Sequence, residues 1–413
     1  MQSNLAIDGG RPVRSEPMPV RGLIGEDERA AATAVFDEAI RTGVASGYGG
    51  PYEDAYEKAF AAFLGGGFAD GVNSGTNAVY CALGGLQLDV LSEVICPAIT
   101  DPGGIMPVAL LGCVPVPADT DPHSFNIGAE QIAPLITPRT RAVIVAHMCG
   151  EPVDMEPVLE LARKHDLYVI EDCAQAHGAR YRGNLVGTFG DVAAFSTMFG
   201  KHHCTGGQGG VVYTQDEDLY WRVKRFADRG KPFHTDAPGN VVAGLNCNLT
   251  DLAAAIGSVQ LRKLPRIIAR RRDVGETVKA ALSDNPIVSV GRQVPETECV
   301  YWFLRIKLET GRVTVDKERF CAALAAEGLP VTPSYDAISC DRPWFRNRAV
   351  FGRSGFPWTA AEYAGPREPR PDLANARKAV AGHFNVAVHE NYTKRDTRDI
   401  VDALTKVADA YAA

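Results

Sequence analysis

The sequence has little that would place it in a membrane, on nucleic acid or outside the cell. No apolar run approaches the roughly 18–20 residues that a membrane-spanning helix requires. The opening residues, MQSNLAIDGGRPVR, lack the basic stretch followed by an apolar stretch that marks a signal peptide. There is no long basic run and the net charge is −7, which argues against nucleic acid as the main partner. We therefore expect a cytoplasmic protein.

The cysteines also lack the spacing that would indicate a cross-linked or metal-bound fold. There are 10 of them, they are scattered, and none forms a CxxC pair. This distribution argues against both a zinc site and a disulfide framework. We expect most of them to be small buried apolar residues in a reducing compartment, and we expect no metal site.

What is present is a regular alternation of short apolar runs with amphipathic helical segments. The chain has 413 residues, enough for more than one domain. Residues 141–146 (RAVIVA) form a continuous apolar run, as in a strand buried on both faces. The alternation predicts an α/β fold with a mostly parallel sheet between helices, whose ligands bind at the carboxyl ends of the strands.

The sequence pattern changes beyond about residue 275, where we expect a smaller α+β domain. The predicted organisation is an N-terminal arm over residues 1–25, a large domain over 26–272 and a small C-terminal domain over 273–413. A helix over residues 250–272 contains Pro265, which predicts a kink or a break there. Residues 343–371 are rich in proline, glycine, arginine and aromatics, and they predict a long loop or an insertion.

Two segments with reactive residues follow predicted strands. In FSTMFGKHHCTGGQGG, Ser196 is followed five residues later by Lys201 and then by a glycine-rich turn. A lysine amine can form an imine with an aldehyde cofactor and then act as a base or an acid, and a serine hydroxyl can bind a phosphate. In EDCAQAHGA, Asp172 follows the strand LYVI, and on its own it would be read as a helix cap.

Two further segments contain turns that precede helices. In NSGTNA, the backbone N–H groups at a helix N-terminus would form an anion site, where Gly75 permits close approach and Thr76 offers its hydroxyl; a plain capped turn is the alternative. The segment GLNCNLTDLAAAIGSVQL contains Asn246 just before a long helix.

Taken together, the four segments resemble the DegT/DnrJ/EryC1/StrS family of sugar aminotransferases, which have the aspartate-aminotransferase fold (pyridoxal-phosphate fold type I). The resemblance runs from about residue 5 to the C-terminus. It implies that pyridoxal phosphate (PLP, or its amino form PMP) is the cofactor. It also implies that Lys201 forms the Schiff base, that Asp172 pairs with the pyridine nitrogen, and that Gln175 lies beside the phenolic oxygen.

The resemblance further implies how the cofactor phosphate is held. Gly75, Thr76 and Ser196 would bind it, and Asn246 would reach the phosphate of the neighbouring subunit. The active sites would then be shared within a homodimer.

This chain departs from the family pattern at several positions. Asp101, in PAITDPGG, stands where the family often has an aromatic residue stacked on the cofactor. Gln208 replaces a usual glutamate, Asn248 replaces a usual arginine, and the glycine-rich turn is one residue longer. Counting back from the end of that turn would place His202 at the Schiff-base position, where the related PMP-dependent sugar dehydratases have a histidine. Counting forward from Ser196 instead places Lys201 at that position.

The resemblance implies an aminotransferase that moves an amino group from glutamate or glutamine to a keto sugar (nucleotide-linked or free) or a keto cyclitol, in amino-sugar or secondary-metabolite biosynthesis. A PLP- or PMP-dependent dehydratase, lyase or oxidase on the same fold stays open, as does a regulatory protein that only binds PLP. The candidate substrate residues, each of which could instead be structural, are Asp101, His177, His202, Arg229 and Tyr335.

Overall fold

The structure is a computed structural model that describes residues 5–335, 338–366 and 372–413. Its central element is a seven-stranded sheet in the order β1-β9-β8-β5-β4-β2-β3. Neighbours from β8 to β3 pair in parallel, whereas β9 is antiparallel to both β8 and β1. The predicted α/β fold with a mostly parallel sheet is confirmed. The strands are β1 Phe68–Val72, β2 Glu93–Pro97, β3 Val114–Ala118, β4 Thr140–Ala146, β5 Tyr168–Asp172, β8 Val192–Ser196 and β9 Gly210–Thr214.

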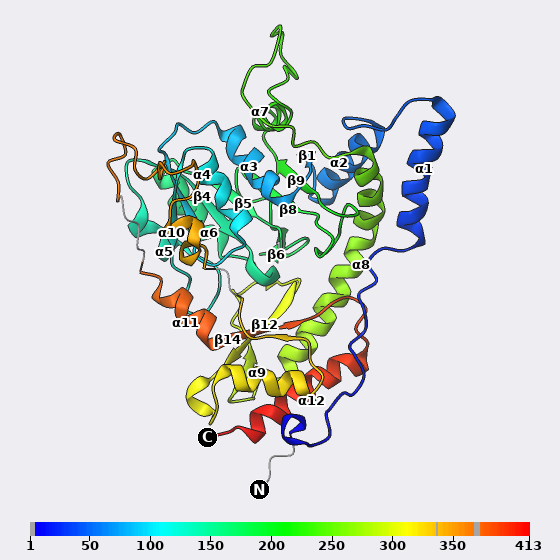
Figure 1. Cartoon of the computed structure of the whole chain (residues 1–413), viewed down its shortest axis with the longest axis vertical. Helices are drawn as coiled ribbons and strands as arrows, with labels where there is room; N and C mark the ends of the chain where they lie inside the picture. Colours follow the sequence, from blue (N-terminus) through cyan, green and yellow to red (C-terminus); the bar gives the residue numbers. More distant parts are fainter. Residues whose placement is uncertain (1–4, 336–337, 367–371) are drawn as a thin grey trace.

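Helices cover both faces of this sheet because its strands are apolar on both sides. In β8, Ala194 packs under α3 and α7, whereas Ala193 and Phe195 point to the opposite face and pack near α2 and α8. Figure 1 shows these helices around the sheet. The helices of this part are α2 Pro51–Phe63, α3 Gly75–Leu86, α4 Met106–Leu110, α5 Ala129–Ile132, α6 Met155–His165 and α7 Glu217–Ala227.

Helix α8 (Asp251–Ala281) runs from the large sheet to the C-terminal part of the chain (Figure 1). It packs against α1 (Glu26–Thr42) and α2 at one end and against α12 (Lys394–Ala410) at the other. Pro265 lies inside α8 but does not end it. The domain boundary expected between residues 272 and 273 falls within this helix, and its position stays a prediction.

A second sheet, in the order β10-β12-β14-β13, is antiparallel throughout. Leu304 and Ile306 of β12 and Phe384 and Val386 of β14 form a core with α8, α9 and α12 on one face. The opposite face turns toward the large sheet, where Arg305 forms a buried ion pair with Glu151 at 2.8 Å. The elements are β10 Val288–Val290, β12 Phe303–Leu308, β13 Val331–Thr332, β14 His383–Ala387, α9 Lys317–Ala326 and α11 Ala374–Gly382.

The proline-rich segment after residue 343 begins with the short helix α10 (Pro343–Arg346) and continues mainly as turns. Trp358 and Tyr363 are buried, and the Tyr363 hydroxyl donates to Glu93 Oε1 of β2 at 3.0 Å. The described part of the predicted insertion therefore packs onto the large sheet, and residues 367–371 lie outside the described residues. Three short strands form a third sheet: β6 Arg180–Tyr181, β7 Asn184–Leu185 and β11 Thr297–Glu298.

None of the helices in the described part of the chain is both long enough and apolar enough to cross a bilayer.

Candidate active site

A cavity of about 170 Å³ lies at the carboxyl ends of β5 and β8, beside the N-terminus of α3. Because parallel strands end at the same edge of a sheet, segments far apart in sequence meet there. Six of the predicted site residues line this cavity: Gly75, Thr76, Asp101, Asp172, Ser196 and Lys201. Met198 and Gln208 line it as well. Gln208 is one of the departures noted in the sequence, whereas nothing local marked Met198.

One end of the cavity is built for an anion. Ser74 is the N-cap of α3, and its hydroxyl accepts from the Asn77 N–H at 3.1 Å. The N–H groups of Gly75 and Thr76 lie in the first turn, where a helix offers them no carbonyl, and the helix dipole adds positive potential. A Cβ on Gly75 would lie 2.5 Å from the Cβ of Ser196, so only glycine allows this approach.

Asp172, the last residue of β5, presents a carboxylate at the floor of the cavity. Its side chain is buried, and Oδ1 accepts from the Ala174 N–H at 3.0 Å. Oδ2 faces Gly104, where a Cβ would lie only 2.9 Å from it. Burial raises the pKa of Asp172, whereas the Ala174 N–H and the Lys201 ammonium act to lower it. The second carboxylate oxygen is therefore positioned to pair with a cationic N–H group of a ligand.

Lys201 follows β8 in a buried turn. Its Nζ lies 4.3 Å from the centre of the Trp302 ring. Burial lowers the pKa of Lys201, against the opposing influence of Asp172 and Asp101. A lowered pKa increases the fraction of neutral amine, which is the form that attacks a carbonyl. Trp302 immediately precedes β12, and no local motif marked it.

A partly buried network of charges holds the turn that contains Lys201. The guanidinium of Arg21 donates to the carbonyl oxygens on either side of this lysine, Gly200 O at 3.1 Å and His202 O at 3.0 Å. Arg21 also pairs with Glu390 Oε1 at 2.8 Å, and the other oxygen of Glu390 pairs with Arg271 at 3.0 Å. The N-terminal arm, α8 and the segment after β14 thus converge on the backbone of the Lys201 turn.

We expect the Glu390→Gln variant to be less stable than the wild type by about 2–4 kcal/mol at neutral pH, because two arginines lose their shared anion. Burial raises the pKa of Glu390, but Arg271 and Arg21 outweigh this and keep it below its usual value. The ion pairs of Glu390 therefore stabilise the fold at pH values above the unfolded-state pKa of this glutamate, about 4.3. The stabilisation is lost as the pH falls through its lower folded-state pKa. The stability difference should accordingly shrink below about pH 4.

Urea denaturation at several pH values measures this difference. Glu26→Gln provides the control, because the Glu26–Arg29 pair is exposed and should contribute little. An equal effect of the two substitutions at neutral pH would contradict the proposed importance of the network.

The remaining predicted residues lie outside the cavity. Gln175 is beside it: its Oε1 accepts from the Cys149 N–H at 2.8 Å, and its Nε2 donates to the Tyr335 hydroxyl at 3.0 Å. His177 and His202 are buried behind the Lys201 turn, where His202 Nε2 bonds the Val300 carbonyl at 3.1 Å.

Arg229 and Asn246 lie on the surface of this chain. Arg229 pairs with Asp228 at 2.9 Å and donates to the Tyr48 hydroxyl at 2.6 Å. Asn246 is exposed, and its Oδ1 accepts from Asn248 Nδ2 at 2.6 Å. Neither side chain lines the cavity of its own chain.

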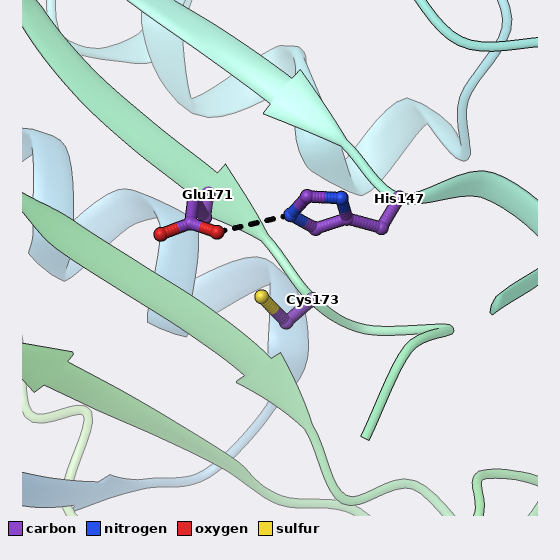
Figure 2. Close-up of side chains that lie close together, drawn as sticks. All are labelled: His147, Glu171 and Cys173. Atoms are coloured by element: carbon purple, nitrogen blue, oxygen red, sulfur yellow. Dashed lines mark hydrogen bonds and ion pairs between the residues drawn. The ribbon is translucent and has the colours of Figure 1, made fainter. Parts of the chain in front are cut away.

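One group of possible metal ligands occurs among the described residues, and Figure 2 shows it: His147, Glu171 and Cys173. His147 Nδ1 accepts from the Val153 N–H at 3.0 Å, so Nε2 bears the proton of the neutral ring and donates to Glu171 Oε2 at 3.1 Å. Both ring nitrogens of His147 are therefore engaged within the protein, and the imidazole offers a metal ion no free nitrogen.

The carboxylate of Glu171 is occupied in the same way. It accepts backbone N–H bonds from Gly187 at 2.8 Å and from Phe189 and Gly190 at 2.7 Å. These bonds satisfy a buried charge and fix the loop after β7 against the end of β5. We therefore interpret the group as a structural support next to Asp172.

Comparison with known proteins is consistent with this geometry. The family model of the DegT/DnrJ/EryC1/StrS aminotransferase family matches residues 26–405. A GDP-perosamine synthase of Caulobacter vibrioides is 34% identical over 85% of this chain and 89% of its own. An L-glutamine:2-deoxy-scyllo-inosose aminotransferase of Micromonospora echinospora is 31% identical over 98% of this chain and 97% of its own. The crystal structure of an aminotransferase from Psychrobacter cryohalolentis superposes with a TM-score of 0.82 at 28% identity, covering 94% of this chain and 98% of its own.

Proposed function

Because the chain belongs to the DegT/DnrJ/EryC1/StrS aminotransferase family, we propose that it transfers an amino group from glutamine or glutamate to a keto cyclitol or a keto sugar, with Lys201 and Asp172 as the catalytic residues. The chain is a PLP-dependent aminotransferase, as its family is. The observation that carries the assignment of residues is the meeting of a buried lysine, a buried carboxylate and a helix N-terminus in one cavity.

The polar groups of the cavity match the two ends of PLP. The N–H groups of Gly75 and Thr76 and the Ser196 hydroxyl would bind the phosphate. The free oxygen of Asp172 would keep the ring nitrogen protonated. Gln175 Nε2 retains a second hydrogen for the phenolic oxygen. When bound, PLP supplies an electron-withdrawing ring that stabilises negative charge on the substrate carbon.

Lys201 has two proposed tasks. Its amine would hold the cofactor covalently, and as a free amine it would accept or donate a proton at the substrate carbon. The lowered pKa of this buried amine suits the second task, because the amine must be neutral to accept a proton. The dehydratase alternative is not favoured, since Lys201 lines the cavity whereas the His202 ring is held behind it by the Val300 carbonyl.

The keto cyclitol is the first candidate acceptor. The relative named for 2-deoxy-scyllo-inosose aligns over nearly the whole of both chains, including the N-terminal arm that holds the Lys201 turn, and its name specifies L-glutamine. The nucleotide-linked keto sugar is the second candidate, supported by the higher identity to a GDP-perosamine synthase.

A homodimer is part of the proposal. Asn246 is exposed, and the neighbouring side chains of Leu245 and Val241 are exposed although apolar, at 58% and 45%. A second copy covering this surface would bury them and bring Asn246 to the phosphate of the neighbouring cavity.

The Asn246→Asp variant should bind PLP at least about tenfold more weakly, because a carboxylate beside the phosphate adds repulsion. A cofactor titration followed by absorbance measures the affinity. Asn184→Asp adds the same charge at an exposed position of β7 and should leave the affinity unchanged. Unchanged affinity in the Asn246 variant would remove this residue from the site.

The proposed function is tested with the purified holoenzyme. Borohydride should bleach its visible absorption band and fix the cofactor on the peptide that contains Lys201. Glutamine or glutamate should bleach the unreduced band, and a keto cyclitol or keto sugar should then restore it. A protein that gains no band with added PLP would refute the proposal.

A further inference from the structure

The indole ring of Trp302 lies over the amine of Lys201. Nζ is 4.3 Å from the ring centre, a distance at which the negative face of an indole attracts a cation. The indole Nε1 donates to the Gly200 carbonyl at 3.2 Å, so the ring is fixed to the turn that contains the lysine. Over the described ranges, 5–335, 338–366 and 372–413, Nζ forms no hydrogen bond and no ion pair. The attraction of the aromatic face therefore competes with no directed bond at this amine.

The backbone that presents this ring is strained. Tyr301, the residue before Trp302, has a φ of 46°, in the left-handed region that is unfavourable for a tyrosine. The guanidinium of Arg271 donates to the Tyr301 carbonyl at 3.0 Å and to the Trp302 carbonyl at 3.3 Å. The Trp302 N–H donates to the Cys149 carbonyl at 2.9 Å. Strain that surrounding contacts maintain in this way is typical of functional positions, and the side chain that follows the strained residue is the one over Lys201.

Two carboxylates also act on this amine. Asp172 and Asp101 line the same cavity as Lys201. Burial lowers the pKa of Lys201, and the two carboxylates act in the opposite direction. Each carboxylate already accepts from a backbone N–H, that of Ala174 at 3.0 Å and that of Gly103 at 2.9 Å. They therefore act on the amine through space, whereas the Trp302 ring lies directly over it.

The groups behind the turn do not favour an ammonium. His177 and His202 are buried, and burial keeps the pKa of each ring well below its ordinary value, so both are neutral. A second cavity, of about 620 Å³, borders the turn, and four of its lining residues are Arg21, Arg271, Trp302 and Asn385. The two arginines share one carboxylate, that of Glu390, which leaves a net positive charge on this side. This charge and the burial of the site disfavour a protonated amine, whereas the aromatic face favours one.

The proposed tasks of Lys201 require its amine to carry a proton for part of each cycle. The neutral amine accepts a proton at the substrate carbon, and the resulting ammonium must then give that proton away again. In a buried site the ammonium needs a partner that stabilises it. A carboxylate in an ion pair would hold one hydrogen in a directed bond, whereas an aromatic face attracts the charge and leaves all three hydrogens free to be donated.

We propose that Trp302 is a positioning residue that holds the protonated amine of Lys201 over its indole face whenever this amine is not bonded to the cofactor. The inference rests on the proposed function and names the group that stabilises its acid–base residue. One proton arrives on Nζ and the same ammonium later releases one, so the indole is unchanged by the cycle.

The test measures the pKa of Lys201 in the holoenzyme loaded with PMP, in which this amine is not bonded to the cofactor. The protein is labelled with ¹³C at the lysine Cε and titrated by NMR, and the Lys201 signal is assigned by its absence in Lys201→Arg. Wild type is compared with Trp302→Phe, which keeps an aromatic face, and with Trp302→Leu, which removes it. Trp221→Leu is the matched control, because it removes an indole that stacks on His234.

In Trp302→Leu we expect the pKa of Lys201 to fall by about one pH unit, because the ammonium loses the ring and the neutral amine loses little. Trp302→Phe should show a smaller fall, since a phenyl face binds a cation less strongly than an indole face. The rising limb of the pH–rate profile for the half-reaction with the ketone should move to lower pH by the same amount, because the neutral amine then persists to lower pH. Trp221→Leu should change neither quantity.

A pKa of Lys201 that stays constant or rises in Trp302→Leu would overturn the proposal, and so would equal falls in the leucine and phenylalanine variants. Circular dichroism checks that each variant is folded. If Trp302→Leu does not fold, Trp302→Phe decides, and a pKa equal to that of the wild type would overturn the proposal. A wild type that takes no amino group from glutamine or glutamate would instead refute the proposed function, whereas the pKa comparison concerns Trp302 alone.

Discussion

The Lys201→Ala variant is expected to lose transamination, with kcat reduced at least about 10⁴-fold, because the chain then lacks both the nucleophile that holds the cofactor and the base that moves the proton. Folding should be intact, since the substitution removes a buried amine whose burial already lowers its pKa. The variant should still bind PLP through the N-terminus of α3, but without covalent attachment.

Single-turnover kinetics, a borohydride reduction and a thermal melt together measure these effects. Lys58→Ala is the matched control, because Lys58 is an exposed lysine on α2. Normal turnover by the Lys201 variant would rule out the mechanism. A large drop in its melting temperature would instead indicate that Lys201 has a structural role.

The Asp172→Asn variant should retain PLP and lose about 100- to 1,000-fold in kcat. The Ala174 N–H would hold the amide oxygen where it now holds Oδ1, which leaves the amide NH₂ facing the ring nitrogen. An amide NH₂ donates where a carboxylate accepts, so it favours the unprotonated ring and weakens its ability to withdraw electrons.

The Asp101→Asn variant tests whether Asp172 acts on the cofactor ring or only through the pKa of Lys201. Both aspartates line the cavity, and both act to raise the pKa of Lys201. Asp101, however, is already engaged by the Gly103 N–H at 2.9 Å as the cap of a short helical turn. We expect its substitution to cost less than about tenfold in kcat. Equal losses in the two variants would mean that Asp172 acts only through the lysine.

The sequence by itself determined the sheet and the core of the candidate site. The run predicted as a strand at residues 141–146 is β4 (Thr140–Ala146), and the predicted strand LYVI lies within one or two residues of the ends of β5 (Tyr168–Asp172), because these runs are buried along most of their length and their apolar composition shows it. Asp172 and Ser196 are the last residues of two strands, Lys201 follows the second of them, and Gly75 opens a helix after another strand. Since the strands that end in Asp172 and Ser196 are parallel neighbours, these residues had to meet at one edge.

Only the tertiary structure decided what surrounds that core. Arg21, Trp302, Glu390 and Asn385 reach the Lys201 turn or its neighbouring cavity from the arm and the C-terminal part of the chain. Tyr335, which the sequence analysis had named as a candidate, also lines that cavity. Their contacts are distant in sequence and follow no period, so no local pattern predicts which arginine pairs with which glutamate or which aromatic ring lies over the lysine. The packing of the second sheet and of α8 against the large sheet brings them there, and that packing depends on the whole chain.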